Sequence, residues 1–428
     1  MKRSARFVFG ICLALILVLN LSVYAAPKTN LRFMWWGGES RHKATIDAIE
    51  LYTKKNPNVK IEGEYGGFTG YQQKLLTQLA GGTAADIIQI DQPWMGELMS
   101  RGDMFADLNK LKDIDLSTFD KNFLENQCQW ENKLIGLPTG LNGLSFFANT
   151  SFFARHNIPL DINWDWEKLI EIGTRIHKQN KSNYLLTMDI SHMQNLLKMY
   201  MLQHNGSKDW VNENFTLGFD KKDLTEAFSY YLRLIETGTI PPLEETVLLD
   251  SKTEQNPRWI SGDIGIAQNW ASSVSLFKLD GKIKLDVVSL PLLKKSNNTG
   301  ILVRPSQLMV INKRSSNVKE AAKFVNWFFN DPEAILILKS ERGIPSTNLA
   351  TKLLEENKLI DPIMAKGINL AMKDAGLPEN SLTTNKELIT IFGEYIQQVG
   401  FKRLTPAKAA DQMMRSYQLK LKELKAQQ

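Results

Sequence analysis

The chain has 428 residues, of which 43% are hydrophobic and 23% charged, which is ordinary for a globular protein. The formal net charge is +6 and falls to +3 without the three basic residues of the expected signal segment, a bias too mild for a nucleic-acid-binding protein. The mature length of about 400 residues exceeds one compact core and predicts two or three domains.

The first residues predict export. A short basic stretch precedes the apolar run Phe7–Leu19, and small residues follow at Ala25 and Ala26. The run is shorter than the roughly 18 residues of a membrane span, so we expect cleavage near Ala25 or Ala26 and a periplasmic protein. Cys12 lies upstream of that cut, which predicts a protein without a lipid anchor; a cut just before Cys12 would instead give a lipoprotein. Cys128 is then the mature chain's only cysteine, so no intrachain disulfide can form.

The N-terminal part alternates strands and helices. Hydrophobic periodicity predicts them in the order strand, helix, strand, helix, strand, over residues 31–36, 41–55, 59–62, 71–80 and 85–90. Ser40 is the expected N-cap of the first helix. This order is typical of a parallel sheet, and ligands of such sheets lie beyond the carboxyl ends of the strands. Residues 35–39 and 91–94 fall at such ends.

The pattern breaks near residues 137–140, where we expect the chain to cross to another lobe. Further elements are predicted as helices over 166–179, 193–204, 222–237 and 318–329, and as strands over 264–267, 285–289 and 308–311. The strand at 264–267 is expected to run into a loop at Gln268, Asn269 and Trp270. The C-terminal part is expected to be helical and to pack on a lobe.

Signatures of catalysis are missing from the sequence. The five histidines show no metal-ligand spacing, and neither a phosphate loop, a dinucleotide fingerprint nor a nucleophile elbow occurs. We therefore expect a non-enzymatic protein without cofactor or metal. The alternative from another class is a secreted polysaccharide-processing enzyme, which would need a metal or a paired acid and base in its cleft.

Several separated segments resemble one family, the extracellular solute-binding proteins of sugar-importing ABC transporters, related to the maltose-binding type. The segments that carry this resemblance are Ala80–Ile87, Ile135–Pro138 with Ser145–Asn149, Asn163–Leu169, Ser261–Ile266, Lys319–Ala322 and Gly343–Pro345. Ala85 stands where the family usually has proline, and Asn163 where it has threonine. A narrower likeness, in Trp35-Trp36-Gly37-Gly38 with Arg41 and His42, is to the members that bind oligogalacturonides and related uronides.

The resemblance implies an α/β protein of two lobes that close by a hinge around a ligand in the cleft. The implied division is a signal peptide over 1–26, a first lobe over 27–138 plus about 300–340, and a second lobe over 139–299 plus about 341–428. The closed form would dock on an ABC-transporter membrane permease. We expect a monomer that captures an oligosaccharide.

A sugar site needs aromatic rings for apolar C–H faces and planar polar groups for hydroxyls, and a uronide also needs cations. Tryptophans and polar residues at the predicted strand ends meet the first two needs, and Tyr71, with Phe68, stands near a glycine-rich turn. Arg41 is the first candidate for the carboxylate, with Arg304 second and Arg342 third. The expected ligand-binding residues are Trp35, Trp36, Glu39, Arg41, Tyr71, Asp91, Trp94, Asn269, Trp270, Arg304 and Arg342.

Two other readings stay open within the binding class. A neutral oligosaccharide or polyol would leave Arg41 and Arg304 pointing away from the cleft. A binding protein that only feeds a membrane receptor would carry the same sequence features as an importer component.

Overall fold

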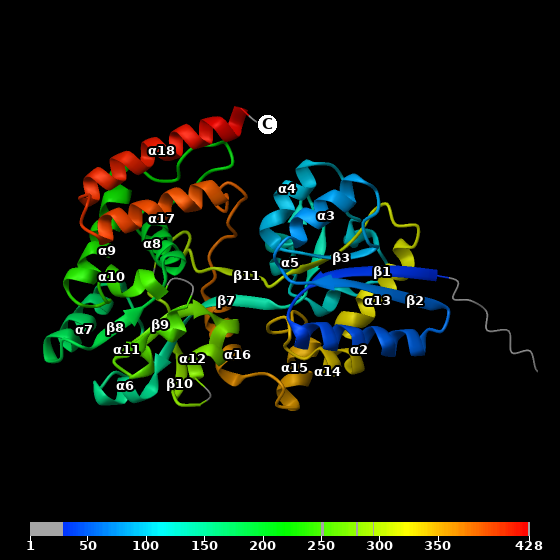
Figure 1. The fold of residues 1–428 in the computed structure, drawn as a ribbon, viewed down its shortest axis with the longest axis horizontal. Helices are drawn as coiled ribbons and strands as arrows, with labels where there is room; N and C mark the ends of the chain where they lie inside the picture. Colours follow the sequence, from blue (N-terminus) through cyan, green and yellow to red (C-terminus); the bar gives the residue numbers. More distant parts are fainter. Residues whose placement is uncertain (1–28, 250–251, 280, 294, 427–428) are drawn as a thin grey trace, which may run out of the picture.

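The computed structural model describes residues 29–249, 252–279, 281–293 and 295–426. The expected signal segment and its cleavage site lie outside these residues. In the part of the chain that is described, none of the helices combines the length and hydropathy needed to cross a membrane. The chain forms two lobes that lie side by side in Figure 1, each built on its own five-stranded sheet.

The sheet of lobe 1 contains the three strands expected at the N-terminus. Its order is β2-β1-β3-β12-β6, with parallel pairing of β1 to β2 and β3, and antiparallel pairing of β12 to β3 and β6. The strands are β1 (Thr29–Trp36), β2 (Val59–Gly66), β3 (Ile87–Ile90), β6 (Gly136–Pro138) and β12 (Leu308–Ile311). Leu31 and Phe33 of β1 are fully buried, because helices cover both faces of this sheet.

Helices of lobe 1 come from two separate parts of the chain. They are α2 (Glu39–Lys55), α3 (Tyr71–Ala80), α4 (Met95–Ser100), α5 (Lys121–Gln127), α13 (Val318–Asn330), α14 (Pro332–Leu338) and α15 (Asn348–Glu356). A small hairpin of β4 (Gln129–Trp130) and β5 (Lys133–Leu134) follows α5. Helix α13 forms as its apolar spacing predicts, with Ala321, Phe324 and Phe328 buried.

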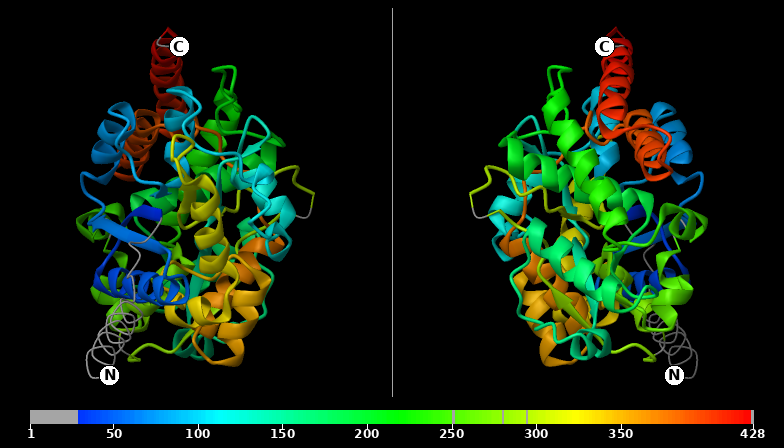
Figure 2. Two further views of the ribbon diagram at one scale, coloured as in Figure 1. Left: turned by 90° about the vertical axis from the view of Figure 1, so that its right-hand side faces the viewer. Right: turned by 90° about the vertical axis from the view of Figure 1, so that its left-hand side faces the viewer.

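The sheet of lobe 2 has the order β10-β7-β9-β8, with β11 paired to the near end of β7. The strands are β7 (Leu141–Asn149), β8 (Tyr184–Thr187), β9 (Ile264–Trp270), β10 (Leu285–Val288) and β11 (Val303–Pro305). The helices are α6 (Thr150–Arg155), α7 (Trp166–Gln179), α8 (Ile190–Asn205), α9 (Lys221–Glu236), α10 (Leu243–Thr246), α11 (Pro257–Ile260), α12 (Val274–Lys278), α16 (Pro362–Lys373), α17 (Lys386–Gly400) and α18 (Pro406–Ala426). Helix α18 lies over the top of lobe 2 in Figure 1 and rises at the top of both views in Figure 2.

Two local expectations differ from the structure. Helix α2 begins at Glu39 with Gly38 as N-cap, so Ser40 is not the cap; its hydroxyl donates instead to Glu341 Oε2 at 2.6 Å. Strand β9 continues through Trp270 rather than ending at residue 267, because Ser145 and Leu144 of β7 pair with Asn269 and Trp270.

The chain passes between the lobes at closely packed segments. Leu141 exchanges backbone hydrogen bonds with Ile344 (2.6 and 3.3 Å), and Ser306 N donates to Gly140 O (2.8 Å). A Cβ at Gly140 would lie 2.3 Å from the carbonyl oxygen of Arg342, so this position has room only for glycine.

The late part of lobe 1 extends further than the expected boundary at about residue 341. Helix α15 packs against α13 and α14, and Figure 1 places it beneath lobe 1. The chain joins lobe 2 only after α15, where Asp361 forms an ion pair with Lys278 at 2.5 Å.

Cys128 is the single cysteine of the described residues. It follows α5 in lobe 1 and is fully buried, and this burial raises the pKa of its thiol. The thiol is therefore chemically inert in the folded chain.

Candidate functional site

Two connected cavities lie between the lobes. The first, which we call the Arg304 chamber, has a volume of about 330 Å³ and is lined by Gln92 and Pro93 of lobe 1, by β11, and by Trp270, Lys198 and Glu379 of lobe 2. The second, the Asp209 chamber, has a volume of about 640 Å³. The two chambers share Gln92, Pro93, Pro378, Glu379 and Thr384. Their sizes are those of ligand pockets, and they open beyond the carboxyl end of β3, as expected for an α/β sheet.

Arg304 stands on β11, where it pairs with Asn142 of β7. Its guanidinium carbon lies 4.5 Å from the centre of the Trp270 ring, a cation–π contact. Burial raises the pKa of the Asp91 carboxyl, and the positive charge of Arg304 acts in the opposite direction. Arg304, Trp270 and Asp91, three expected residues from different parts of the chain, are therefore brought together.

A second layer holds Trp270 and its neighbour in place. The side-chain oxygen of Asn269 accepts from Trp270 N (2.8 Å) and Ser273 Oγ (3.0 Å), so it is engaged within the protein. The His192 ring lies 6.4 Å from the Trp270 ring, and its Nδ1 lies 2.7 Å from Asp189 Oδ1. Both members of this His–Asp pair are buried.

Lys198 of α8 and Glu379, in the segment between α16 and α17, form an ion pair that lines the Arg304 chamber. The sequence analysis did not identify either residue. Helix α8 carries Lys198 on a largely buried face, with the side chain only 11% exposed, and its partner lies 181 positions later. The one available signal was a lysine among apolar neighbours on a predicted helix.

An aromatic cluster lies at the carboxyl end of β1. The Trp36 ring packs on Tyr71 (4.8 Å), Trp94 (5.3 Å) and Phe68 (5.5 Å), and Phe68 stacks on Trp94. Phe68, which the sequence analysis named beside Tyr71, is 54% exposed and offers the free ring of this cluster. The expectation for Tyr71 is corrected, because this side chain is buried and its hydroxyl lies 2.8 Å from Gln89 O.

Trp35 is also a correction. Its side chain is fully buried and stacks on Tyr65 at 4.8 Å, and its Nε1 donates to His42 Nδ1 at 3.1 Å. Successive side chains of a strand point to opposite faces, so Trp35 and Trp36 cannot both face the same ligand.

The remaining two expected arginines lie outside the chambers. Arg41 donates through Nε and Nη2 to Glu341 O and through Nη1 to Trp36 O, so backbone carbonyls occupy the place expected for a ligand carboxylate. Burial lowers the pKa of Arg41, and Glu341 counteracts this shift. Glu39 is exposed in the first turn of α2.

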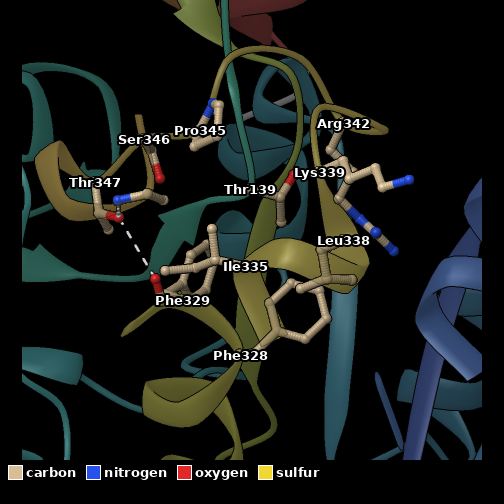
Figure 3. A pocket seen from close by; sticks show the side chains of 11 residues that line it. Thr139, Phe328, Phe329, Ile335, Leu338, Lys339, Arg342, Pro345, Ser346 and Thr347 are labelled. Atoms are coloured by element: carbon tan, nitrogen blue, oxygen red, sulfur yellow. Dashed lines mark hydrogen bonds between the residues drawn. The ribbon is translucent and has the colours of Figure 1, made fainter. Parts of the chain in front are cut away.

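Arg342 is buried in lobe 1, which corrects its expected role in the cleft. Its Nη2 donates to Thr45 Oγ1 at 2.8 Å and its Nε to Gln89 Oε1 at 3.3 Å. Burial and the nearby charge of Arg41 lower the pKa of Arg342 to about 9. It lines a separate cavity of about 40 Å³, where Figure 3 shows it beside Leu338 and across from Thr347. That volume suits a few water molecules and is too small for a sugar.

Solved structures share the whole fold. A periplasmic solute binding protein from Pectobacterium atrosepticum is 25% identical, with a TM-score of 0.80, and the alignment covers 92% of this chain and 99% of that one. A periplasmic oligogalacturonide binding protein from Yersinia enterocolitica is 24% identical over the same shares, with a TM-score of 0.81. A structure described as a de novo designed esterase is 25% identical, again over 92% and 99%, with a TM-score of 0.85.

Curated relatives match a smaller part. A putative binding protein of Brucella abortus is 21% identical over 193 residues, which is 45% of this chain and 46% of that protein. The chain thus aligns with about half the length of the curated relatives it matches.

The family model of the bacterial extracellular solute-binding proteins matches residues 38–335. This range includes strands β2, β3, β6 and β12 of lobe 1, the whole sheet of lobe 2 and the Arg304–Trp270 pair, whereas strand β1 lies before it. The chain belongs to the bacterial extracellular solute-binding protein family.

Proposed function

We propose that the protein captures an oligosaccharide in the periplasm and delivers it to the membrane permease of an ABC transporter, as a monomer after removal of its signal peptide. Family membership supports the binding role, and the two chambers between the lobes supply a site of suitable size. A ligand that contacts both lobes stabilises their closed arrangement, because it gains its full contacts only there. No bond of the ligand is made or broken.

The ligand that the geometry supports best carries a carboxylate, as a uronide does. The observation that carries this proposal is the position of Arg304, whose guanidinium lies over Trp270 at the wall of the chamber. A guanidinium held in this way keeps its N–H edge available for a planar carboxylate. Lys198 lines the same chamber, where its charge is paired with Glu379, so Arg304 is the cation left for the ligand among the described lining residues. We therefore assign the role of binding the ligand carboxylate to Arg304, the second candidate from the sequence, instead of Arg41.

The test is calorimetric titration of the mature protein with galacturonate oligomers and with neutral oligosaccharides of equal length. We expect acidic oligomers to bind. Arg304→Gln should lower their affinity by about tenfold or more, because a charge-assisted contact of 1.5–3 kcal/mol is lost. Arg41→Gln is the matched control, since its guanidinium is held by carbonyls outside the chambers. Equal losses in both variants would contradict the assignment of Arg304.

A neutral oligosaccharide is the second candidate. The observation that favours it is the uncharged platform of Phe68 and Trp94, whose rings stack at 5.6 Å. Sugars pack their C–H faces on such rings. Binding of neutral oligomers only, unchanged in Arg304→Gln, would support this alternative and reject the acidic ligand.

A further inference from the structure

The two chambers differ in charge. Two cations, Arg304 and Lys198, line the Arg304 chamber, and its one acidic side chain, Glu379, is already paired with Lys198. Among the described residues that line the Asp209 chamber none is basic, and three acidic side chains, Glu131, Asp209 and Glu213, lie there in addition to the paired Glu379.

Two effects raise the pKa of the Asp209 carboxyl. Burial is the larger one, and repulsion from the neighbouring charge of Glu213 adds to it. The hydrogen bond from Asn380 (3.3 Å) and the charge of Lys208 act against this shift. Lys208 lines a smaller cavity together with Lys198, Asp209 and Glu379, and it is not among the residues that line the Asp209 chamber. A second carboxylate placed beside Asp209 would therefore be repelled.

The same chamber is otherwise suited to sugar hydroxyls. Gln92, Asn126 and Gln129 offer planar amides, and Trp130 offers an aromatic ring. Amides both donate and accept hydrogen bonds. They are therefore better partners for the hydroxyls of a ligand, which also do both, than for its carboxylates, which only accept. Because the chambers meet at Gln92 and Glu379, one extended ligand can occupy both.

We propose that the ligand is an oligosaccharide with a single carboxylate, on the unit in the Arg304 chamber, followed by neutral sugar units in the Asp209 chamber. This inference rests on the proposed capture of an acidic oligosaccharide and restricts its class. Like charges brought together at a binding site discriminate strongly between ligands, so a ligand charged on every unit is disfavoured.

The test uses one series of ligands that differ only in charge: trigalacturonate, its two dimethyl esters that keep one terminal carboxylate, and its trimethyl ester. Calorimetric titration of the full mature chain gives each affinity. We expect one of the two mono-acid esters to bind about tenfold or more tightly than both trigalacturonate and the trimethyl ester.

The double variant Asp209→Asn, Glu213→Gln removes the repulsion. We expect it to strengthen trigalacturonate binding several-fold and to leave the favoured mono-acid ester unchanged within about twofold. The matched control is Glu171→Gln on α7, a helix on the far side of lobe 2 in Figure 1. It should change the affinity for neither ligand.

The outcomes are separable. If trigalacturonate binds as tightly as the mono-acid esters, or if the double variant leaves its affinity unchanged, the inference fails while acidic-oligosaccharide capture stands. If the trimethyl ester binds best, both the inference and the proposal of an acidic ligand are contradicted. If no member of the series binds, both are likewise rejected for galacturonate-based ligands.

Discussion

At the scale of single residues, the buried pair of Asp189 and His192 beneath Trp270 links the site to acid stability. Burial raises the pKa of Asp189, but hydrogen bonds and charge from His192 outweigh it and set the pKa at about 2. A carboxyl with a depressed pKa stabilises the fold above its unfolded value near 3.8, and this contribution is lost as the pH falls from about 4 to 2.

We therefore expect Asp189→Asn to lower the free energy of unfolding by about 2 kcal/mol at pH 6, with a smaller difference at pH 3. Asparagine still caps helices, so the charge rather than the cap is removed. Urea unfolding at several pH values measures this. Asp120→Asn is the control, since Asp120 caps α5 in the same way, through Phe123 N. A cost that does not vary with pH would contradict the role of the carboxylate.

The individual site residues show how far sequence reasoning reaches. Asp91 and Trp270 were expected at strand ends and Arg304 at the return to lobe 1, and the structure brings the three together although β3 and β9 belong to different sheets. Arg41 could not be placed correctly, since the carbonyl that holds it comes from Glu341, 300 positions away. Trp35 was assigned with Trp36 although strand alternation puts neighbouring side chains on opposite faces.

At the scale of elements, the packing of the crossing segments predicts a sharp difference between two glycines. Gly140→Ala would place a methyl group 2.3 Å from Arg342 O, whereas at Gly66 nothing lies within 4 Å of the new methyl. We expect Gly140→Ala to lower the free energy of unfolding by about 1–3 kcal/mol and Gly66→Ala to leave it almost unchanged. Thermal or urea unfolding distinguishes them, and equal stabilities would show that the crossing segments can separate without cost.

Elements were predicted well where their signal is local. Helices α3 and α7 have the expected bounds, because apolar periodicity and terminal residues such as the N-cap Asp165 act within a few positions. The placement of α15 in lobe 1 and the continuation of β9 to Trp270 were missed. Both depend on contacts with distant segments, α14 and β7, that no local pattern encodes.

At the scale of the whole molecule, the two lobes approach each other at the wall of the Asp209 chamber, where Gly96 faces Ser381. A Cβ built on Gly96 of lobe 1 lies 3.1 Å from Ser381 Cβ of lobe 2. This separation is a few tenths of an ångström below the roughly 3.5–4.5 Å of a disulfide, so small shifts would admit one.

We expect Gly96→Cys with Ser381→Cys to form an intramolecular disulfide on oxidation and to slow ligand release by at least about tenfold, because the lobes must part for the ligand to leave. Stopped-flow measurement before and after reduction tests this, with each single variant as control. A crosslinked protein that releases ligand at the original rate would show that the ligand leaves without separation of the lobes.

The burial of Cys128 has a practical consequence for such studies. Since its thiol is enclosed and its pKa is raised, maleimide dyes should leave it unmodified in the folded chain. Fluorophores can then be attached to one introduced surface cysteine in each lobe without first replacing the native residue. Energy transfer between the two dyes would follow opening and closing in single molecules of otherwise unaltered protein.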